Sequence, residues 1–226
     1  MRYEIKGKPL PVVECYLEAG ESMQCDGGAM SWMSPNMKME TLGGGIGGVF
    51  SKAFSGQKMF SNKYTAEGKE GMIGFASNFP GDILAVELHD GKDIVCQKSI
   101  YLAATEGIKR SIFFQKKLGA GFFGGEGFIM QRMTGEGTIF LKVDGSTVTK
   151  ELAAGEQIVV DTGHVAIIDS SCSIDIVTVK GVKNVFLGGE GLFNTVVTGP
   201  GRVILQTMPI CQLANTLGAY TISVSD

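Results

Sequence analysis

Residues 123–128 read Phe-Gly-Gly-Glu-Gly-Phe, and after five more residues the stretch 134–137 reads Thr-Gly-Glu-Gly. Both stretches recur 64 residues later without a gap, as Leu-Gly-Gly-Glu-Gly-Leu at 187–192 and Thr-Gly-Pro-Gly at 198–201. Agreement at this many positions indicates an internal repeat. Such self-similarity is typical of repeat architectures, in which one unit cannot bury its apolar face alone.

The repeat extends further towards the N-terminus and occurs a third time. Residues 88–96 and 152–160 match at the same offset of 64, because each has Leu, then Gly three residues later, then an apolar run. Residues 17–21, Leu-Glu-Ala-Gly-Glu, resemble the Leu-Ala-Ala-Gly-Glu of 152–156. We therefore predict a single domain of three repeats, at about 17–87, 88–151 and 152–208, followed by a C-terminal helix at 209–218.

The apolar runs in each repeat are short and β-branched, and turns that contain glycine separate them. This pattern predicts an all-β fold, as a sandwich or a barrel-like arrangement of sheets, with short helices. A three-unit solenoid and a threefold-symmetric prism of sheets both fit such repeats. Residues 108–117 and 182–187 are each expected to form about two turns of helix, and the helix after Pro209 is expected to stop at Gly218.

Equivalent positions of the repeats should form equivalent turns. We expect matched glycines to occupy matched turns and matched threonines to close corresponding strands. The glycines are 20, 91 and 155 in one set and 68, 137 and 201 in the other; the threonines are Thr65, Thr134 and Thr198.

Composition limits the classes of protein that this chain can represent. Of its 226 residues, 44% are hydrophobic and 19% are charged, so it is expected to fold into a globular core. The net charge of -3 makes nucleic acid an unexpected partner, because nucleic-acid binding proteins normally carry a basic face. The first residues have no apolar run of a secretory signal, and the five cysteines form no Cys-x-x-Cys pair. We expect reduced thiols and a cytoplasmic location.

Several motifs together carry a resemblance to a known family. They are Phe-Gln-Lys-Lys-Leu-Gly-Ala-Gly at 114–121, the two Phe-x-Gly-Gly-Glu-Gly stretches, Asp-Thr-Gly-His at 161–164 and Thr-Gly-Pro-Gly-Arg-Val at 198–203. The chain resembles the altered inheritance of mitochondria (mitochondrial biogenesis) family, in its bacterial and archaeal branch of uncharacterised function.

The resemblance covers about residues 12–217. It implies a fold like that of the tryptophan RNA-binding attenuator protein, a β-sandwich related to the double-stranded β-helix, with three pseudo-symmetric repeats. The fungal relatives are tied to the organisation of the inner mitochondrial membrane, and without a presequence only the core module carries over to this chain. The family offers no agreed catalytic residues.

Candidate catalytic and metal sites have simpler structural interpretations. The glycine tract at 43–48 lacks the lysine that a phosphate-binding loop needs at its end. The two histidines, His89 and His164, stand at non-equivalent repeat positions, which disfavours a metal site, and His164 is expected to be structural. Glu126 and Glu190 are repeat equivalents, and we interpret them as turn-capping residues rather than an acid–base pair. We therefore assign no catalytic, cofactor or metal residue, and expect no cofactor.

Two further groups also favour a structural interpretation. Cys25 and Cys96 are repeat equivalents whose third position holds Val160, so their thiols should be buried and unreactive. Basic residues at 109–110 and 116–117 flank Ile-Phe-Phe at 112–114. We interpret this segment as the solvated face of a helix rather than an RNA-binding patch.

The first repeat carries an insertion at 42–54 that is rich in glycine and apolar residues. Ile46, Val49, Phe50 and Phe54 form a candidate interaction surface, with 49–54 as a short helix that contacts a neighbouring subunit or a lipid surface. The leading hypothesis is a non-enzymatic, homo-oligomeric β-module that scaffolds or binds a protein or a membrane surface. The alternatives are a small-ligand binding or sensing module and an enzyme of unrecognised type.

Overall fold

The structure is a computed structural model of the whole chain, and it describes residues 1–42, 61–89, 91–117, 127–178 and 193–218. Most of the described residues are in strands, so the predicted all-β fold is confirmed. They form two compact units. Unit 1 comprises residues 1–91, 101–109 and 135–142, and unit 2 comprises residues 92–100, 110–134 and 143–226.

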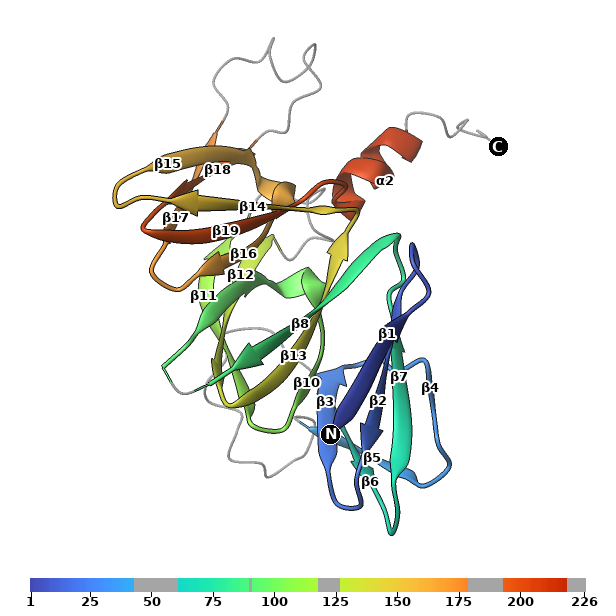
Figure 1. Cartoon of the computed structure of the whole chain (residues 1–226). Coiled ribbons are helices and arrows are strands. Elements are labelled where there is room, and N and C mark those ends of the chain that lie inside the picture. The colour runs from blue at the N-terminus through green and yellow to red at the C-terminus, as the bar shows by residue number, and fades with distance from the viewer. Residues whose placement is uncertain (43–60, 90, 118–126, 179–192, 219–226) are drawn as a thin grey trace. The chain divides into compact units, whose positions relative to one another are not determined.

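Unit 1 contains two sheets (Figure 1). The N-terminal sheet has the order β1-β2-β7-β4, and the first six-stranded sheet has the order β5-β6-β3-β10-β13-β8. The strands are β1 (Arg2–Lys6), β2 (Val12–Leu17), β3 (Ser22–Asp26), β4 (Trp32–Met33), β5 (Met37–Leu42), β6 (Ser61–Ala66), β7 (Gly71–Ala76), β8 (Gly81–Leu88), β10 (Tyr101–Thr105) and β13 (Gly137–Asp144).

Unit 2 also contains two sheets. The second six-stranded sheet has the order β11-β12-β9-β16-β19-β14, and the C-terminal sheet has the order β15-β18-β17. The strands are β9 (Ile94–Gln97), β11 (Ile108–Lys116), β12 (Phe128–Gly135), β14 (Thr147–Leu152), β15 (Gln157–Asp161), β16 (Val165–Asp169), β17 (Ser173–Thr178), β18 (Phe193–Thr198) and β19 (Gly201–Gln206).

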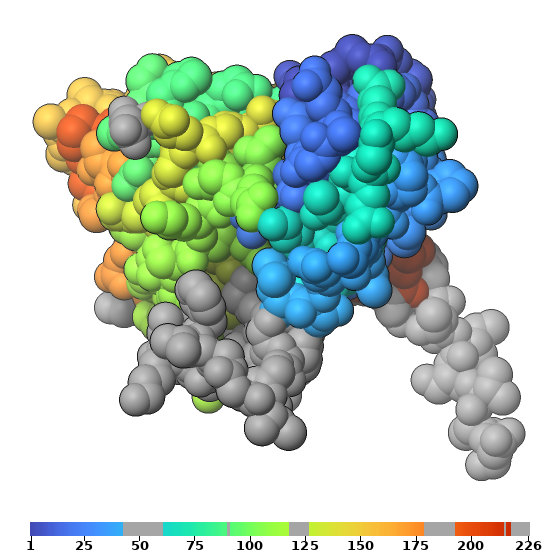
Figure 2. All heavy atoms as spheres, turned by 90° about the horizontal axis from the view of Figure 1, so that it is seen from below, coloured from blue at the N-terminus to red at the C-terminus, as the bar shows by residue number. Residues whose placement is uncertain are grey.

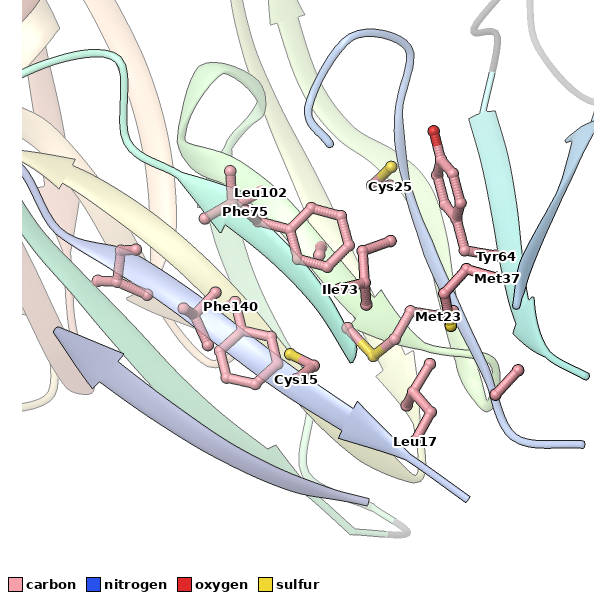
Figure 3. Close-up of a cluster of buried hydrophobic side chains, with 14 residues drawn as sticks. Cys15, Leu17, Met23, Cys25, Met37, Tyr64, Ile73, Phe75, Leu102 and Phe140 are labelled. Atoms are coloured by element: carbon pink, nitrogen blue, oxygen red, sulfur yellow. The ribbon is translucent and has the colours of Figure 1, made fainter. Parts of the chain in front are cut away.

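Each unit is a sandwich, because its two sheets share one apolar core. In unit 1, Cys15 of β2 and Phe75 of β7 pack with Met23 of β3 and Phe140 of β13 (Figure 3). The described residues from the N-terminus through β7 form one continuous body of packed atoms (Figure 2, blue to cyan). In unit 2, residues of β9, β12, β16 and β19 pack with Val160 of β15 and with residues of β17 and β18. Strand β2 shows the expected alternation, with every second residue buried.

The sequence offsets reappear as an offset of strands. Strands β8 to β13 of the second repeat are followed, in the same order, by β14 to β19 of the third. β10 at 101–105 and β16 at 165–169 differ by 64 residues, as do the short 3-10 helices η2 (Lys98–Ile100) and η4 (Thr162–His164). β2 to β7 repeat the order in the first repeat. Leu17, Leu88 and Leu152, where the sequence suggested that repeats start, are the last residues of β2, β8 and β14.

The turn predictions are confirmed for one set of glycines and only partly for the other. Gly20, Gly91 and Gly155 have φ values of +90°, +81° and +78°, in equivalent turns. Gly137 and Gly201 have φ values of +137° and +140° and begin β13 and β19. The match of Gly68 with these two is wrong, because the first repeat has a longer turn there and Gly71 begins the equivalent strand β7. Thr65, Thr134 and Thr198 lie at or next to the ends of β6, β12 and β18, as expected.

The helix predictions had mixed outcomes. Residues 108–116 form strand β11 rather than a helix, and β11 pairs with β12 at the edge of a sheet. Its β-branched and aromatic residues at 112–114 favour a strand, and sheet pairing overrides the weak helical pattern. Residues 182–187 lie outside the described part of the chain. Helix α2 (Ile210–Gly218) follows Pro209, as expected. The division into one domain with three repeats stays a prediction.

Candidate functional site

The candidate interaction surface inferred from the sequence, with Ile46, Val49, Phe50 and Phe54, lies outside the described residues. The two repeat-equivalent glutamates, Glu126 and Glu190, also lie outside them. β5 ends at Leu42, the first residue of the predicted insertion, and the Leu42 side chain is exposed.

The two histidines lie in different units. His89 is exposed directly after β8. His164 ends the short helix η4, and its Nδ1 lies 2.7 Å from the main-chain oxygen of Gln206. This hydrogen bond supports the structural role expected for His164. Among the described residues, no group of three or more His, Cys, Asp or Glu side chains is placed to hold a metal ion.

The carbonyl that contacts His164 belongs to a buried amide cluster. Gln206 donates from Nε2 to the Gly163 main-chain oxygen at 2.9 Å, and its Oε1 accepts from the Asp144 main-chain nitrogen at 3.0 Å. The Gln206 amide also lies 3.4 Å from Oε1 of the buried Gln97. The amide of Gln206 therefore ties together β9, the end of β13, η4 and β19. This cluster satisfies buried polar groups and is structural.

The thiols are buried as predicted. Cys15, Cys25 and Cys96 are fully buried, Cys172 is buried, and only Cys211 on α2 is partly exposed. All five are free. Burial raises the pKa of Cys15 and of Cys96 to about 12, and it also raises the pKa of Cys172 and of Cys211. Thiols held protonated in this way are poor nucleophiles.

One basic residue and two aromatic residues of β11 are engaged within unit 2. Lys116 donates from Nζ to the Ile176 main-chain oxygen at 2.7 Å. The Arg132 guanidinium lies over the Phe113 ring at 5.1 Å, and Phe114 packs edge-on against Phe128. These rings are part of the core packing rather than an open surface on which bases stack.

The sheets join successive repeats in a way that the residue types alone do not reveal. Each six-stranded sheet combines half of one repeat with half of the next. The half from the earlier repeat, which we call its trailing half, is β5-β6-β3 in one sheet and β11-β12-β9 in the other. The half from the later repeat, which we call its leading half, is β10-β13-β8 in the first sheet and β16-β19-β14 in the second. The first repeat leaves its leading half, β4-β7-β2, in the N-terminal sheet. The third repeat leaves its trailing half, β15-β18-β17, in the C-terminal sheet. In the described part of the chain, β4 and β15 are therefore edge strands where their counterparts are central.

The β15 edge exposes a position that is buried in the second repeat. Val159 of β15 is 61% exposed, whereas Val95, its equivalent 64 residues earlier in β9, is 0% exposed. Val95 packs in a core to which Leu152, Val165 and Val203 of the following repeat contribute. In the described part of the chain no strand pairs with the outer side of β15, and Val159 lacks this cover.

The β4 edge has the same character. Trp32 and Met33 are 43% and 37% exposed. Their equivalents, Ala103 and Ala104 in β10 and Ile167 and Ile168 in β16, are buried. Edge strands of natural proteins are usually short, or protected by charge, proline or cover. β4 is short and Pro35 follows soon after it, but both strands expose apolar side chains, Trp32, Met33 and Val159. We take them together as the candidate site and call them the open edges.

The Trp32 ring is held in a fixed orientation. Its Nε1 donates to Glu14 Oε1 at 3.2 Å, and Gly74 on the neighbouring strand leaves room for the indole. Lys6 donates to Glu14 Oε2 at 2.8 Å. The hydrogen bonds from Lys6 and then from Trp32 lower the pKa of Glu14, and hydrogen bonds to Glu14 and Glu4 raise the pKa of Lys6. A preordered aromatic side chain is a common anchor at protein interfaces.

The fold and the open edges define a class: an all-β repeat protein whose repeats join by completing each other's sheets. A model of the Mitochondrial biogenesis AIM24 family matches residues 3–208, and the chain belongs to this family. The resemblance inferred from the sequence is thereby confirmed.

The chain is similar to an uncharacterised protein from Streptococcus pyogenes. The two are 29% identical over 230 residues, which cover 97% of this chain and 91% of the relative. It is also similar to a Streptococcus pyogenes protein solved by X-ray crystallography, with 27% identity and a TM-score of 0.79 over 97% of this chain and 99% of that one. No helix in the described part of the chain is long and apolar enough to cross a membrane.

Proposed function

We propose that this protein is a non-enzymatic, homo-oligomeric scaffold. The observation that carries the proposal is the pair of open edges, where positions that are buried in the second repeat are exposed at the first and third repeats. Burying apolar side chains such as Trp32, Met33 and Val159 stabilises association. An assembly of copies would give these residues the cover that their equivalents have.

A structural rather than catalytic use of the polar groups supports the non-enzymatic role. The raised thiol pKa values follow from burial, and the shifts of Lys6 and Glu14 follow from their mutual ion pair on the surface. Shifted pKa values at catalytic sites arise instead from groups that converge in a cleft.

The same proposal includes the partner of the scaffold. This partner is a protein or a membrane surface, which the insertion with Ile46, Val49, Phe50 and Phe54 contacts. The buried, reduced thiols agree with a cytoplasmic location.

Native mass spectrometry of the untagged protein, together with light scattering over a wide range of concentrations, tests the oligomeric state. We expect a single assembly larger than one chain. A monomer at micromolar concentrations would contradict the proposed function.

A further inference from the structure

The two internal junctions between repeats have the same register. The first joins β3 to β10, and the second joins β9 to β16, both antiparallel. Shifted by 71 residues on one strand and 64 on the other, the first set of pairs becomes the second. The pairs are Cys25↔Ala103, Gln24↔Ala104 and Met23↔Thr105 in the first junction, and Cys96↔Ile167, Val95↔Ile168 and Ile94↔Asp169 in the second.

The same offsets can be continued to the open edges. β4 is the counterpart of β10, since Trp32 pairs with Gly74 of β7 as Ala103 pairs with Phe140 of β13. β15 is the counterpart of β9, since each pairs with the fifth strand of its own repeat, β18 or β12. The implied register opposes Trp32 to Val160, Met33 to Val159 and Ser34 to Ile158.

We propose that β4 of one copy of this chain pairs antiparallel with β15 of a second copy in this register. The joint sheet then has the order β17-β18-β15-β4-β7-β2-β1, which repeats the half-sheet order of the two internal junctions. The inference rests on the proposed homo-oligomeric function, and it names the surfaces that associate.

The burial pattern argues for a second copy rather than an unrelated strand. At the internal junction, Val95 packs in one core with Val160 and Val197 of the following repeat, and a second copy offers Val159 an equivalent repeat. Val159 and Met33 are both apolar and directly opposed in the implied register, and such cross-strand pairs stabilise a sheet. None of the six implied pairing residues is charged, so the pairing sets no charged side chain against an apolar one.

Disulfide trapping tests the register. We would prepare Met33→Cys and Val159→Cys as separate variants of different mass, each in a Cys211→Ser background that removes the partly exposed thiol. Mixed under mild oxidation, the two should form a disulfide between copies, because directly opposed residues of paired strands lie within bridging distance. Gln157→Cys, two residues out of register on the same strand, is the matched control and should fail to trap with Met33→Cys.

A charge at the β15 edge tests whether assembly depends on this edge. Val159→Lys should abolish the wild-type oligomer in native mass spectrometry while the circular dichroism spectrum stays unchanged. Val177→Lys is the matched control, because Val177 is 40% exposed on the same sheet but lies on β17, whose counterparts β5 and β11 are also edges. It should leave the oligomer intact.

The outcomes separate the two proposals. A monomeric wild-type protein would overturn both. An oligomer that survives Val159→Lys and gives no trapped Met33→Cys and Val159→Cys pair would overturn the edge pairing alone. The double variant Met33→Cys/Val159→Cys carries both cysteines in one chain. If it is monomeric and forms a disulfide within that chain, the two edges close on each other, and the pairing between copies is overturned.

Discussion

At the scale of single residues, the glycines with positive φ fall into two groups that differ in the space around them. Gly155, at φ +78°, has nothing within 4 Å of the position of an added Cβ. Gly201, at φ +140°, would place a Cβ 2.8 Å from Ser171 Oγ and 2.9 Å from Cys172 Sγ. The first position requires glycine for backbone conformation alone, and the second requires it for conformation and for space.

We expect Gly201→Ala to lower the free energy of unfolding by about 2–4 kcal/mol, because a strained backbone and an overpacked core add. Gly155→Ala is the matched control and should cost about 1–2 kcal/mol, from the backbone alone. Urea denaturation measures both. Equal losses for the two variants would show that Ser171 and Cys172 yield to the added methyl group.

The buried thiols give the stability of the protein a dependence on alkaline pH. The pKa of Cys15 and of Cys96 is about 12 in the folded protein, and a thiol in an unfolded chain titrates near 8.5. Above that pH the unfolded state loses protons that the folded state keeps, so the free energy of unfolding falls as pH rises, until the folded thiols titrate as well.

Urea unfolding between pH 7 and pH 11, under reducing conditions, should therefore show a stability that declines from about pH 8.5. The double variant Cys15→Val/Cys96→Val should decline less, since it lacks two of the thiols. Valine is the residue found at the third-repeat equivalent of Cys96 and at the second-repeat equivalent of Cys15, Val86. Identical pH profiles for the variant and the wild type would contradict this explanation.

At the scale of elements, β9 and β15 are the same strand of the repeat in two settings. β9 lies in the middle of a six-stranded sheet, and β15 lies at the edge of a three-stranded one. Val95 and Val159 therefore differ in exposure although their positions in the repeat are equivalent.

A lysine should separate the two settings. Val95→Lys is expected to prevent folding or to lower the free energy of unfolding by more than about 4 kcal/mol, because it buries an unpaired charge. Val159→Lys should change the stability of the monomer by less than about 1 kcal/mol, as for other exposed positions. Thermal unfolding of the two variants checks this difference. Equal destabilisation would mean that β15 is covered within its own chain.

The repeat offsets explain how much of this architecture the sequence alone predicts. An offset of 64 places β10 on β16 and η2 on η4, because the same residues face the same neighbours in successive repeats. β11 was mistaken for a helix, since its weak pattern of apolar residues is decided by pairing with β12 rather than by local preference.

The open edges could not be found by looking for reactive residue types. Trp32, Met33 and Val159 carry no reactive group, and what distinguishes them is that their strands lack a paired neighbour on one side in the described part of the chain. The signal was present in the offsets themselves, because terminal repeats of any array lack one of their two neighbours. The strand order is needed to identify these edges, because it places the two halves of each repeat in two different sheets.

At the scale of the whole molecule, the proposed junction is heterologous, since it joins two different surfaces of identical chains. Each copy offers one β4 edge and one β15 edge. Head-to-tail contacts of this kind close into a ring or extend into a filament, whereas an isologous contact of like edges stops at a dimer. Variants that block a single edge distinguish the two cases.

Met33→Lys should block the β4 edge and keep the β15 edge, and Val159→Lys should do the reverse. Each variant alone is expected to be monomeric, because its open edge finds no complementary one. Mixed in equal amounts, the two should form a one-to-one complex and nothing larger, since only one junction is available to each pair. Native mass spectrometry with one variant labelled by heavy isotopes identifies the complex. A dimer of either variant alone would instead indicate pairing of like edges, because the blocked edge would then play no part in the contact.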